Sequence, residues 1–278
     1  MVDLLAKWQV PLYQERQHTG ILKTIIVRES VAKQNAQVVL VTRTSKFPQL
    51  NNLVADIKSQ LPEVVSIMQN INPQKTSLLW GEQTLKIYGQ DYLEERLGEV
   101  EFRLSARAFF QLNPSQTKVL YDQVKQALDL QADESLIDAY CGVGTIGLYV
   151  APAAKAVYGV DIIPEAIEDA RQNAVLSNRS NVNYEVGAAE KVIPAWVKQG
   201  VKPDALVVDP PRTGLDAQLI KTILQVKPAK FVYVSCNPST LARDLVALSK
   251  VYQVDYIQSV DMFPQTARVE AVVKLSKR

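Results

Sequence analysis

The chain has 278 residues, of which 47% are hydrophobic and 22% charged, enough apolar material for a sizeable core. Its 31 basic and 29 acidic side chains give a net charge of +2, so composition shows no polybasic signature. Two cysteines and one histidine exclude a disulfide framework and a Cys/His-rich metal centre. No apolar run approaches the roughly 20 residues that span a bilayer. We expect a cytoplasmic protein without metal or membrane association.

The first 107 residues are predicted to form a small α+β domain. Short apolar, β-branched segments predict strands, and one amphipathic helix is expected at 51–61. The predicted strands cover 20–30, 36–44, 64–72 and 83–89. The pattern changes near residue 105, and we place the domain boundary between residues 107 and 108.

Residues 108–278 are predicted to form a larger domain in which helices and strands alternate. Helices are expected over 113–130, from 145, over 164–178, around 188–198, from 217 and from 238. Strands are expected over 135–141, 156–161, 182–187, 205–209, 231–235, 252–261 and 269–275. The alternation predicts a Rossmann-like, doubly wound parallel sheet. No helix separates the last two strands, which predicts an antiparallel edge of the kind found in methyltransferases.

A glycine-rich turn follows the first strand of this domain. The segment "DAYCGVGTIGL" places Asp138 at the strand end and Gly142 and Gly144 on the turn into a helix. Asp161 ends the next strand, where a carboxylate accepts hydrogen bonds from ribose hydroxyls. Together they predict a nucleoside cofactor rather than a turn required only for packing. The G-x-G-x-x-G spacing keeps NAD open, but an acid in the turn would repel a pyrophosphate and favours the cationic S-adenosylmethionine.

Two later strand ends carry polar side chains. Asp209 stands in "VVDPPRTGLD", where the alternative is a structural proline turn. Methyltransferases of exocyclic amines often carry an aromatic residue after Asp-Pro-Pro, whereas Arg212 stands here. Cys236 in "VSCNPST" is either buried filler or a nucleophile. A thiolate that adds to carbon 6 of a pyrimidine makes carbon 5 able to take a methyl group, and the pocket must activate the thiol for this step.

A candidate base stands at the start of the last predicted strand. Glu270 has apolar neighbours, so it is either a buried carboxylate with a raised pKa or an ordinary solvent-facing strand residue. Thiolate addition leaves a proton on carbon 5 after methyl transfer, and a base must remove it before the thiolate can leave. A buried Glu270 would suit that step.

Five motifs in this order resemble the RNA uracil-5-methyltransferase family, which includes bacterial enzymes that modify large-subunit ribosomal RNA and transfer RNA. They are "FFQLNPSQTKVLY", "DAYCGVGTIGL", "VVDPPRTGLD", "VSCNPSTLARDL" and "DMFPQTARVEAVV". The resemblance implies Cys236 as the nucleophile and Glu270 as the base. It also implies that S-adenosylmethionine is contacted by Gln111, Tyr140, Asp161 and Asp209, while Cys141 is structural.

The resemblance further implies an RNA substrate, expected to be 23S ribosomal RNA, with transfer RNA as an alternative. Residues 1–107 resemble the family's central, RNA-facing domain. Many relatives also carry an N-terminal TRAM domain and a four-cysteine iron–sulfur cluster, so a truncated chain is expected here. Cytosine carbon 5 methylation and a fragment that only binds RNA stay open as alternatives.

Overall fold

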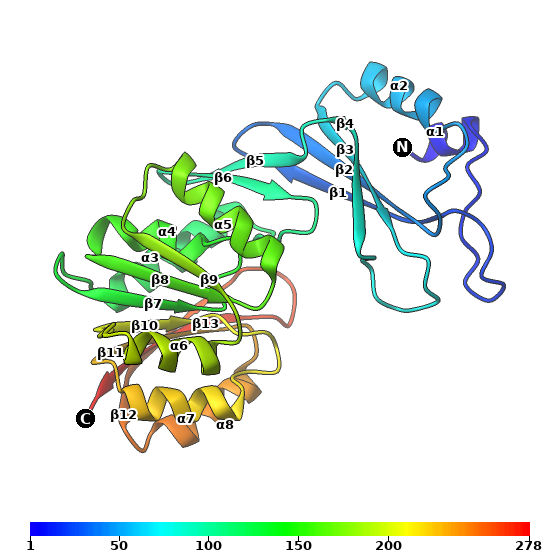
Figure 1. Cartoon of the computed structure of the whole chain (residues 1–278). Helices are drawn as coiled ribbons and strands as arrows, with labels where there is room; N and C mark the ends of the chain where they lie inside the picture. Colours follow the sequence, from blue (N-terminus) through cyan, green and yellow to red (C-terminus); the bar gives the residue numbers. More distant parts are fainter. The chain divides into compact units, whose positions relative to one another are not determined.

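The computed structural model describes residues 1–278, which form two compact units (Figure 1). One unit comprises residues 1–96 and 103–107, and the other comprises residues 97–102 and 108–278. A two-stranded ribbon of β5 (Tyr92–Leu97) and β6 (Val100–Ser105) contributes residues to both units. No helix in the structure has the length and apolar character needed to cross a membrane.

The first unit is built on a four-stranded sheet in the order β1-β2-β3-β4. The strands are β1 (Leu22–Ser30), β2 (Asn35–Thr42), β3 (Val64–Ile71) and β4 (Gln83–Gly89). β2 and β3 run parallel and are connected through α2 (Leu50–Gln60), and the other pairs are antiparallel. Leu53 and Ile57 of α2 and Leu4 of α1 (Val2–Lys7) share a core cluster with the sheet. The four predicted strands and α2 are present, whereas α1 and the β5–β6 ribbon were not predicted.

The second unit contains a seven-stranded sheet in the order β12-β13-β11-β10-β7-β8-β9. Its strands are β7 (Ser135–Ala139), β8 (Ala156–Asp161), β9 (Val182–Val186), β10 (Ala205–Val208), β11 (Lys230–Ser235), β12 (Tyr252–Val260) and β13 (Glu270–Lys277). All neighbours pair in parallel except β13, which is antiparallel to both β11 and β12. The predicted doubly wound sheet with an antiparallel edge is confirmed.

Helices cover both faces of this sheet (Figure 1). One face carries α3 (Pro114–Leu128), α4 (Thr145–Val150) and α5 (Pro164–Leu176), and the other carries α6 (Ala189–Lys198), α7 (Ala217–Val226) and α8 (Pro238–Leu248). Two of these helices, α3 and α8, begin with a side-chain cap followed by a proline in the first turn. Asn113 caps α3 by accepting from the Gln116 amide, and Asn237 caps α8 by accepting from the Ser239 amide.

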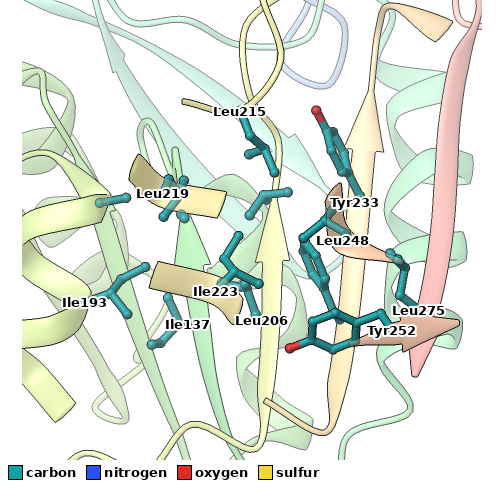
Figure 2. Packing of buried hydrophobic residues seen from close by; sticks show 14 of the residues in the cluster. Ile137, Ile193, Leu206, Leu215, Leu219, Ile223, Tyr233, Leu248, Tyr252 and Leu275 are labelled. Carbon is teal, nitrogen blue, oxygen red and sulfur yellow. The ribbon is translucent and has the colours of Figure 1, made fainter. Parts of the chain in front are cut away.

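Buried side chains between the sheet and the second helical face form one large cluster (Figure 2). It joins Ile137, Leu206, Tyr233 and Leu275 of the strands to Ile193, Leu219, Ile223 and Leu248 of the helices. Burying a Leu or Ile side chain stabilises the fold by about 2 kcal/mol. The strands whose ends carry the candidate site therefore rest on a well-packed layer.

The outer strand β12 is largely exposed. Val254 and Ile257 are 44% and 57% exposed. Its pairing with β13 shifts register between Val254 and Tyr256, which leaves Asp255 as an extra residue in a β-bulge. The Asp255 carboxylate accepts a hydrogen bond of 2.8 Å from the Ser276 hydroxyl across the strand pair.

Candidate active site

The polar residues expected in the site lie along one edge of the seven-stranded sheet. The parallel register pairs Ala139 with both Val160 and Val208, and Val208 with Tyr233. Residues just beyond these pairs therefore lie at a common edge, the carboxyl end of the parallel strands. Asp161 ends β8, Tyr140 follows β7, Asp209 follows β10, Cys236 follows β11, and Glu270 opens the antiparallel β13. The structure thus brings together five residues that are far apart in the sequence.

Cys236 and Glu270 occupy opposite positions on neighbouring strands. The last register pair between β11 and β13 joins Ser235 to Ala271, so Glu270 lies across from Cys236 one position further along. Glu270 is only 8% exposed, and its Oε2 has no hydrogen-bond partner. Burial raises the pKa of Glu270, while the charge of Arg212 acts in the opposite direction. Glu270 is therefore a buried carboxyl, and its reading as a solvent-facing strand residue is wrong.

The Cys236 thiol is free and partly exposed. Burial raises its pKa, the negative charges of Glu270 and Asp209 raise it further, and Arg212 lowers it. The chemistry inferred from the sequence requires a thiol with a lowered pKa, but the surroundings of Cys236 raise its pKa. The reason is that desolvation and two carboxyl groups outweigh a backbone hydrogen bond and the Arg212 guanidinium.

Asp209 shares this crowded electrostatic environment. Burial raises the pKa of Asp209 to about 8, and the charges of Glu270 and Asp138 add to the effect. A carboxyl with such a pKa is largely protonated at neutral pH. The site therefore carries less negative charge than its sequence suggests.

The loop that follows Asp209 is fastened to helix α8 by residues that the sequence did not single out. Asp244 is 1% exposed, and its Oδ2 accepts 2.8 Å hydrogen bonds from the Leu215 amide and the Tyr233 hydroxyl. The Arg243 guanidinium pairs with Asp244 at 2.8 Å and donates to the Thr213 carbonyl at 2.8 Å. Arg243 and Asp244 lie in the quoted motif "VSCNPSTLARDL". Their closeness to Cys236 in the sequence was the signal that could have identified them.

The glycine turn leaves its backbone open at Gly142. This residue has φ +54°, and a Cβ built on it would meet no atom within 4 Å. The Gly142 amide donates to Asp161 Oδ2 at 3.0 Å, and the Ile163 amide donates to Asp161 Oδ1 at 2.9 Å. Asp161 therefore holds the turn and the end of β8 together while staying at the edge where a ligand would bind.

Gly144 and Tyr140 flank this open position. Gly144 precedes α4 with φ +83°, and a Cβ there would come within 2.5 Å of the Tyr184 hydroxyl, so packing alone requires a glycine. Tyr140 has φ +65°, an uncommon conformation for a residue with a side chain. Its ring packs against the large core cluster, and burial raises its pKa. Strained backbone of this kind is concentrated at functional sites.

Asp138 differs from its predicted setting. It lies inside β7, is 1% exposed, and accepts a 2.8 Å hydrogen bond from the Gly147 amide, while its Oδ1 has no partner. Burial raises the pKa of Asp138 to about 7. The carboxyl therefore lies behind the turn and not in it, so the argument that Asp138 would repel a pyrophosphate was wrong.

The two remaining residues differ in their surroundings. Cys141 is 4% exposed and burial raises the pKa of its thiol well above the usual value, which agrees with a structural role. Gln111 lies just before α3, is partly exposed, and has no hydrogen bond on its side-chain amide. That amide is available to a ligand.

Comparisons with known proteins point to one family. The pattern of the tRNA (Uracil-5-)-methyltransferase family matches residues 79–278. An uncharacterised RNA methyltransferase of Enterococcus faecalis is 57% identical over 100% of this chain and 61% of the relative. A second one, from Listeria innocua, is 55% identical over 99% of this chain and 60% of the relative. The chain thus spans about three fifths of the length of these curated relatives.

A solved structure agrees with these relatives. The crystal structure of Pyrococcus abyssi tRNA (uracil-54, C5)-methyltransferase in complex with S-adenosyl-L-homocysteine matches with a TM-score of 0.81 and 32% identity. The match covers 99% of this chain and 64% of that one. The predicted Rossmann-like methyltransferase fold is therefore confirmed.

Proposed function

The chain belongs to the tRNA (uracil-5-)-methyltransferase family, and from this premise we propose that it methylates carbon 5 of a uridine in RNA with S-adenosylmethionine. The observation that carries the proposal is the placement of Cys236 opposite the buried Glu270 at the end of the β11–β13 ladder. Both lie on the same sheet edge as the open turn at Gly142 and its partner Asp161. The proposed nucleophile, the proposed base and the proposed cofactor site therefore share one edge.

The residues at this edge fit S-adenosylmethionine. The open backbone of Gly142 admits a ligand, and the neighbouring carboxylate of Asp161 suits a donor that carries an ammonium and a sulfonium. When bound, this cofactor supplies an electrophilic methyl group. We propose that it is held by Gln111, Tyr140, Asp161, Asp209, Gly142 and Gly144.

The protein's own residues carry the remaining steps. The Cys236 sulfur forms a bond to carbon 6 of uracil, and the electrons of the carbon 5–carbon 6 double bond move toward carbon 5 and the carbon 4 oxygen. After carbon 5 has taken the methyl group, Glu270 accepts the carbon 5 proton. The electrons of that carbon–hydrogen bond re-form the double bond, and the sulfur leaves as a thiolate. Because burial raises the pKa of Glu270, the protonated form is stable enough to end this step.

For the RNA target, we propose 23S ribosomal RNA and keep transfer RNA as the alternative. The first choice rests on the resemblance of the five motifs to bacterial enzymes that act on large-subunit ribosomal RNA. The alternative is supported by the Pyrococcus abyssi structure, whose name specifies uracil 54 of transfer RNA. An RNA substrate also supports the cytoplasm as the compartment. Methyl transfer measured in parallel on unmodified transcripts of both RNAs separates the two targets.

Trapping with 5-fluorouridine RNA tests the proposed chemistry. Fluorine on carbon 5 cannot be removed as a proton, so the reaction stops with Cys236 bonded to RNA. We expect a protein–RNA band that survives denaturation with the wild-type chain and disappears in Cys236→Ala. A band that persists in this variant contradicts the assignment, because Cys141 is the only other thiol. Trapping by 5-fluorocytidine RNA alone would favour the cytosine alternative, and cofactor-dependent RNA binding without any adduct would favour the non-catalytic one.

A further inference from the structure

We propose that Asp244 is a positioning residue for methyl transfer: its carboxylate fixes the loop after Asp209 against the segment that carries Cys236, and so sets the spacing between cofactor and nucleophile. The proposal rests on the proposed function and deepens it. Asp244 is 1% exposed and lies on α8, the helix that starts two residues after Cys236. Neither the proposed cofactor site nor the pair of Cys236 and Glu270 explains a buried carboxylate there.

The ladder between β10 and β11 ends before it reaches the two site residues. Its last register pair is Val208 and Tyr233, so Asp209 and Cys236 both lie beyond it. The Tyr233 hydroxyl donates a 2.8 Å hydrogen bond to Asp244 Oδ2. Burial raises the pKa of Tyr233, so this hydroxyl keeps its proton and stays a donor. Asp244 is thus tied to the point at which the ladder ends.

The same carboxylate holds the loop that follows β10. Its Oδ2 also accepts a 2.8 Å hydrogen bond from the amide of the buried Leu215, which lies with Tyr233 at one end of the large core cluster (Figure 2). Its Oδ1 pairs with the Arg243 guanidinium, which donates to the Thr213 carbonyl at 2.8 Å. We call these contacts the Asp244 clamp. They join the strand end, the loop and α8 through one side chain.

The loop backbone rests directly on α8 at Gly214. A Cβ built on Gly214 would come within 2.5 Å of Asp244 Oδ2 and 2.7 Å of Arg243 Nη2. The loop therefore lies against the helix at a distance that only glycine permits. This close approach is an observation separate from the hydrogen bonds, and it places the loop at the same position.

The start of α8 holds the loop as well. The Arg212 carbonyl accepts a 2.9 Å hydrogen bond from the side-chain amide of Asn237 and a 3.2 Å hydrogen bond from the Thr240 hydroxyl. Asn237 caps α8 and directly follows Cys236. Residues 212–215 are thus fastened to the first turns of the helix that begins beside the nucleophile, and a shift of the loop shifts the Cys236 backbone with it.

A carboxylate is an expensive way to fill this buried position. Its desolvation offsets most of what its partners contribute to stability. Donors that converge on two fixed oxygens do, however, define one arrangement of the segments that carry them. The clamp is therefore explained by the geometry that it enforces.

The proposed reaction depends on that geometry. The Cys236 sulfur bonds to carbon 6 of uracil, and the methyl group goes to carbon 5, the adjacent ring atom. Asp209 is proposed to hold the cofactor that supplies this methyl group, so the spacing between Asp209 and Cys236 must suit one ring. A misplacement of about 1 Å, caused by a change away from the reacting atoms, costs about 10²-fold in rate.

Methyl transfer to RNA by Asp244→Asn is the first test. The amide keeps the size of the side chain, but its nitrogen cannot accept a hydrogen bond, so the converging donors lose one of two acceptors. We expect kcat to fall roughly 10- to 100-fold, with the KM for RNA and the Kd for S-adenosylmethionine within about 3-fold of wild type. An unchanged kcat, or a loss found only in KM or Kd, would overturn the proposal.

Tyr233→Phe is a milder variant that serves both tests if Asp244→Asn does not fold. It removes the tie to the strand end and leaves the Leu215 and Thr213 contacts in place. Its kcat should fall less than that of Asp244→Asn, again without a matching change in KM or Kd. A Tyr233→Phe chain with the kcat of wild type would contradict a clamp that reaches the strand end.

Asp204→Asn is the matched control. Asp204 Oδ2 accepts a 2.7 Å hydrogen bond from the Ser135 amide at the amino end of β7, at the sheet edge opposite the site. The substitution removes the same kind of carboxylate contact and should lower the urea midpoint of unfolding. Its kcat should equal that of wild type. An equal loss of kcat in Asp204→Asn and Asp244→Asn would assign Asp244 to general stability and overturn the proposal.

Hydrogen exchange in the chain without RNA or cofactor is the second test. In Asp244→Asn, the amides of residues 212–215 and 236–240 should both exchange about 10-fold faster, while Asp204→Asn should change neither segment. Faster exchange in the loop alone would show that the segments are not joined, and would overturn the proposal. If the wild-type chain transfers no methyl group, the proposed function fails, while exchange still decides whether Asp244 holds the two segments together.

Discussion

The two ends of the candidate site are built in different ways. At the glycine turn, each oxygen of the Asp161 carboxylate accepts a backbone amide, from Gly142 or from Ile163. At the other end, Glu270 Oε2 is buried without a partner, and the pKa values of Glu270 and Cys236 are both raised. One end is satisfied in its hydrogen bonds, and the other is not.

This difference indicates how the two ends contribute. A satisfied carboxylate holds a fixed shape, which suits the binding of a cofactor before RNA arrives. A buried polar group without a partner, or with a strongly shifted pKa, costs the fold stability. Such groups are concentrated at functional sites, where proton transfer and bond formation occur. Substitutions at the two ends should therefore have effects of different size and kind.

Glu270→Gln should give the largest effect, because it removes the proposed base and keeps the shape of the side chain. Turnover should fall by roughly 10²- to 10⁴-fold. Sulfur addition and methyl transfer precede proton removal, so methylated RNA bonded to Cys236 should accumulate with natural uridine. A denaturing gel with labelled methyl donor measures this band. Normal turnover without a trapped band would show that the base lies elsewhere, with Asp209 as the next candidate.

Asp161→Ala should give a smaller effect, confined to the binding end. Loss of an acceptor for ribose hydroxyls and of the contacts to Gly142 and Ile163 should weaken cofactor binding by about 1–3 kcal/mol, or roughly 5- to 150-fold. Calorimetry on the chain without RNA measures this affinity. Asp161→Asn keeps one acceptor oxygen and should lose less. Equal affinity in wild type and Asp161→Ala would remove this residue from the cofactor site.

Asp209→Asn should give the smallest effect of the three on stability, and this effect depends on pH and is separate from any loss of cofactor binding. The folded-state pKa of Asp209 is about 8, above its ordinary value of 3.8, so the folded protein keeps a proton that the unfolded chain loses between these values. Stability from this group is therefore present at low pH and is lost as pH rises through that window. Removing the titration should stabilise the variant relative to wild type by about 1–2 kcal/mol more at pH 8 than at pH 5.

Urea unfolding at both pH values measures this difference. Asp122→Asn, which removes a carboxylate whose pKa is lowered by the Lys118 and Tyr149 hydrogen bonds, is a matched control. It should show no relative gain at high pH. A constant difference between Asp209→Asn and wild type at the two pH values would contradict a raised pKa at Asp209.

The sequence predicted the sheet of the second unit well, because strands and helices have distinct apolar periods and clear caps such as Asn113 and Asn237. It did not predict β5, because "YLEERL" does not alternate apolar and charged residues, and the inward position between Leu93 and Leu97 is occupied by the buried Glu95. At the site, strand ends placed Cys236 and Glu270 on one edge. The sequence could not predict their pKa shifts, because these depend on carboxyl groups from three different strands that come together only in the fold.

Asp138 and Asp244 show a second kind of limit. The sequence places Asp138 within a residue of the strand end, but whether its carboxyl meets a ligand or the Gly147 amide depends on the direction of the side chain. Asp244 looks like an ordinary helical acid in the sequence. Its role as a buried acceptor for the Leu215 amide and the Tyr233 hydroxyl appears only when α8 packs beside the loop.

The β-bulge at Asp255 bears on how the protein keeps from aggregating. An exposed outer strand has unpaired amides and carbonyls with which a strand of another chain can pair. The exposed side chains of Val254 and Ile257 add apolar surface that favours such pairing. The extra residue breaks the regular register, and its carboxylate places a charge on the strand where a second chain would pair. Asp255 should therefore help to keep the native chain from self-associating at high concentration. A chain with Asp255→Val should self-associate through β12.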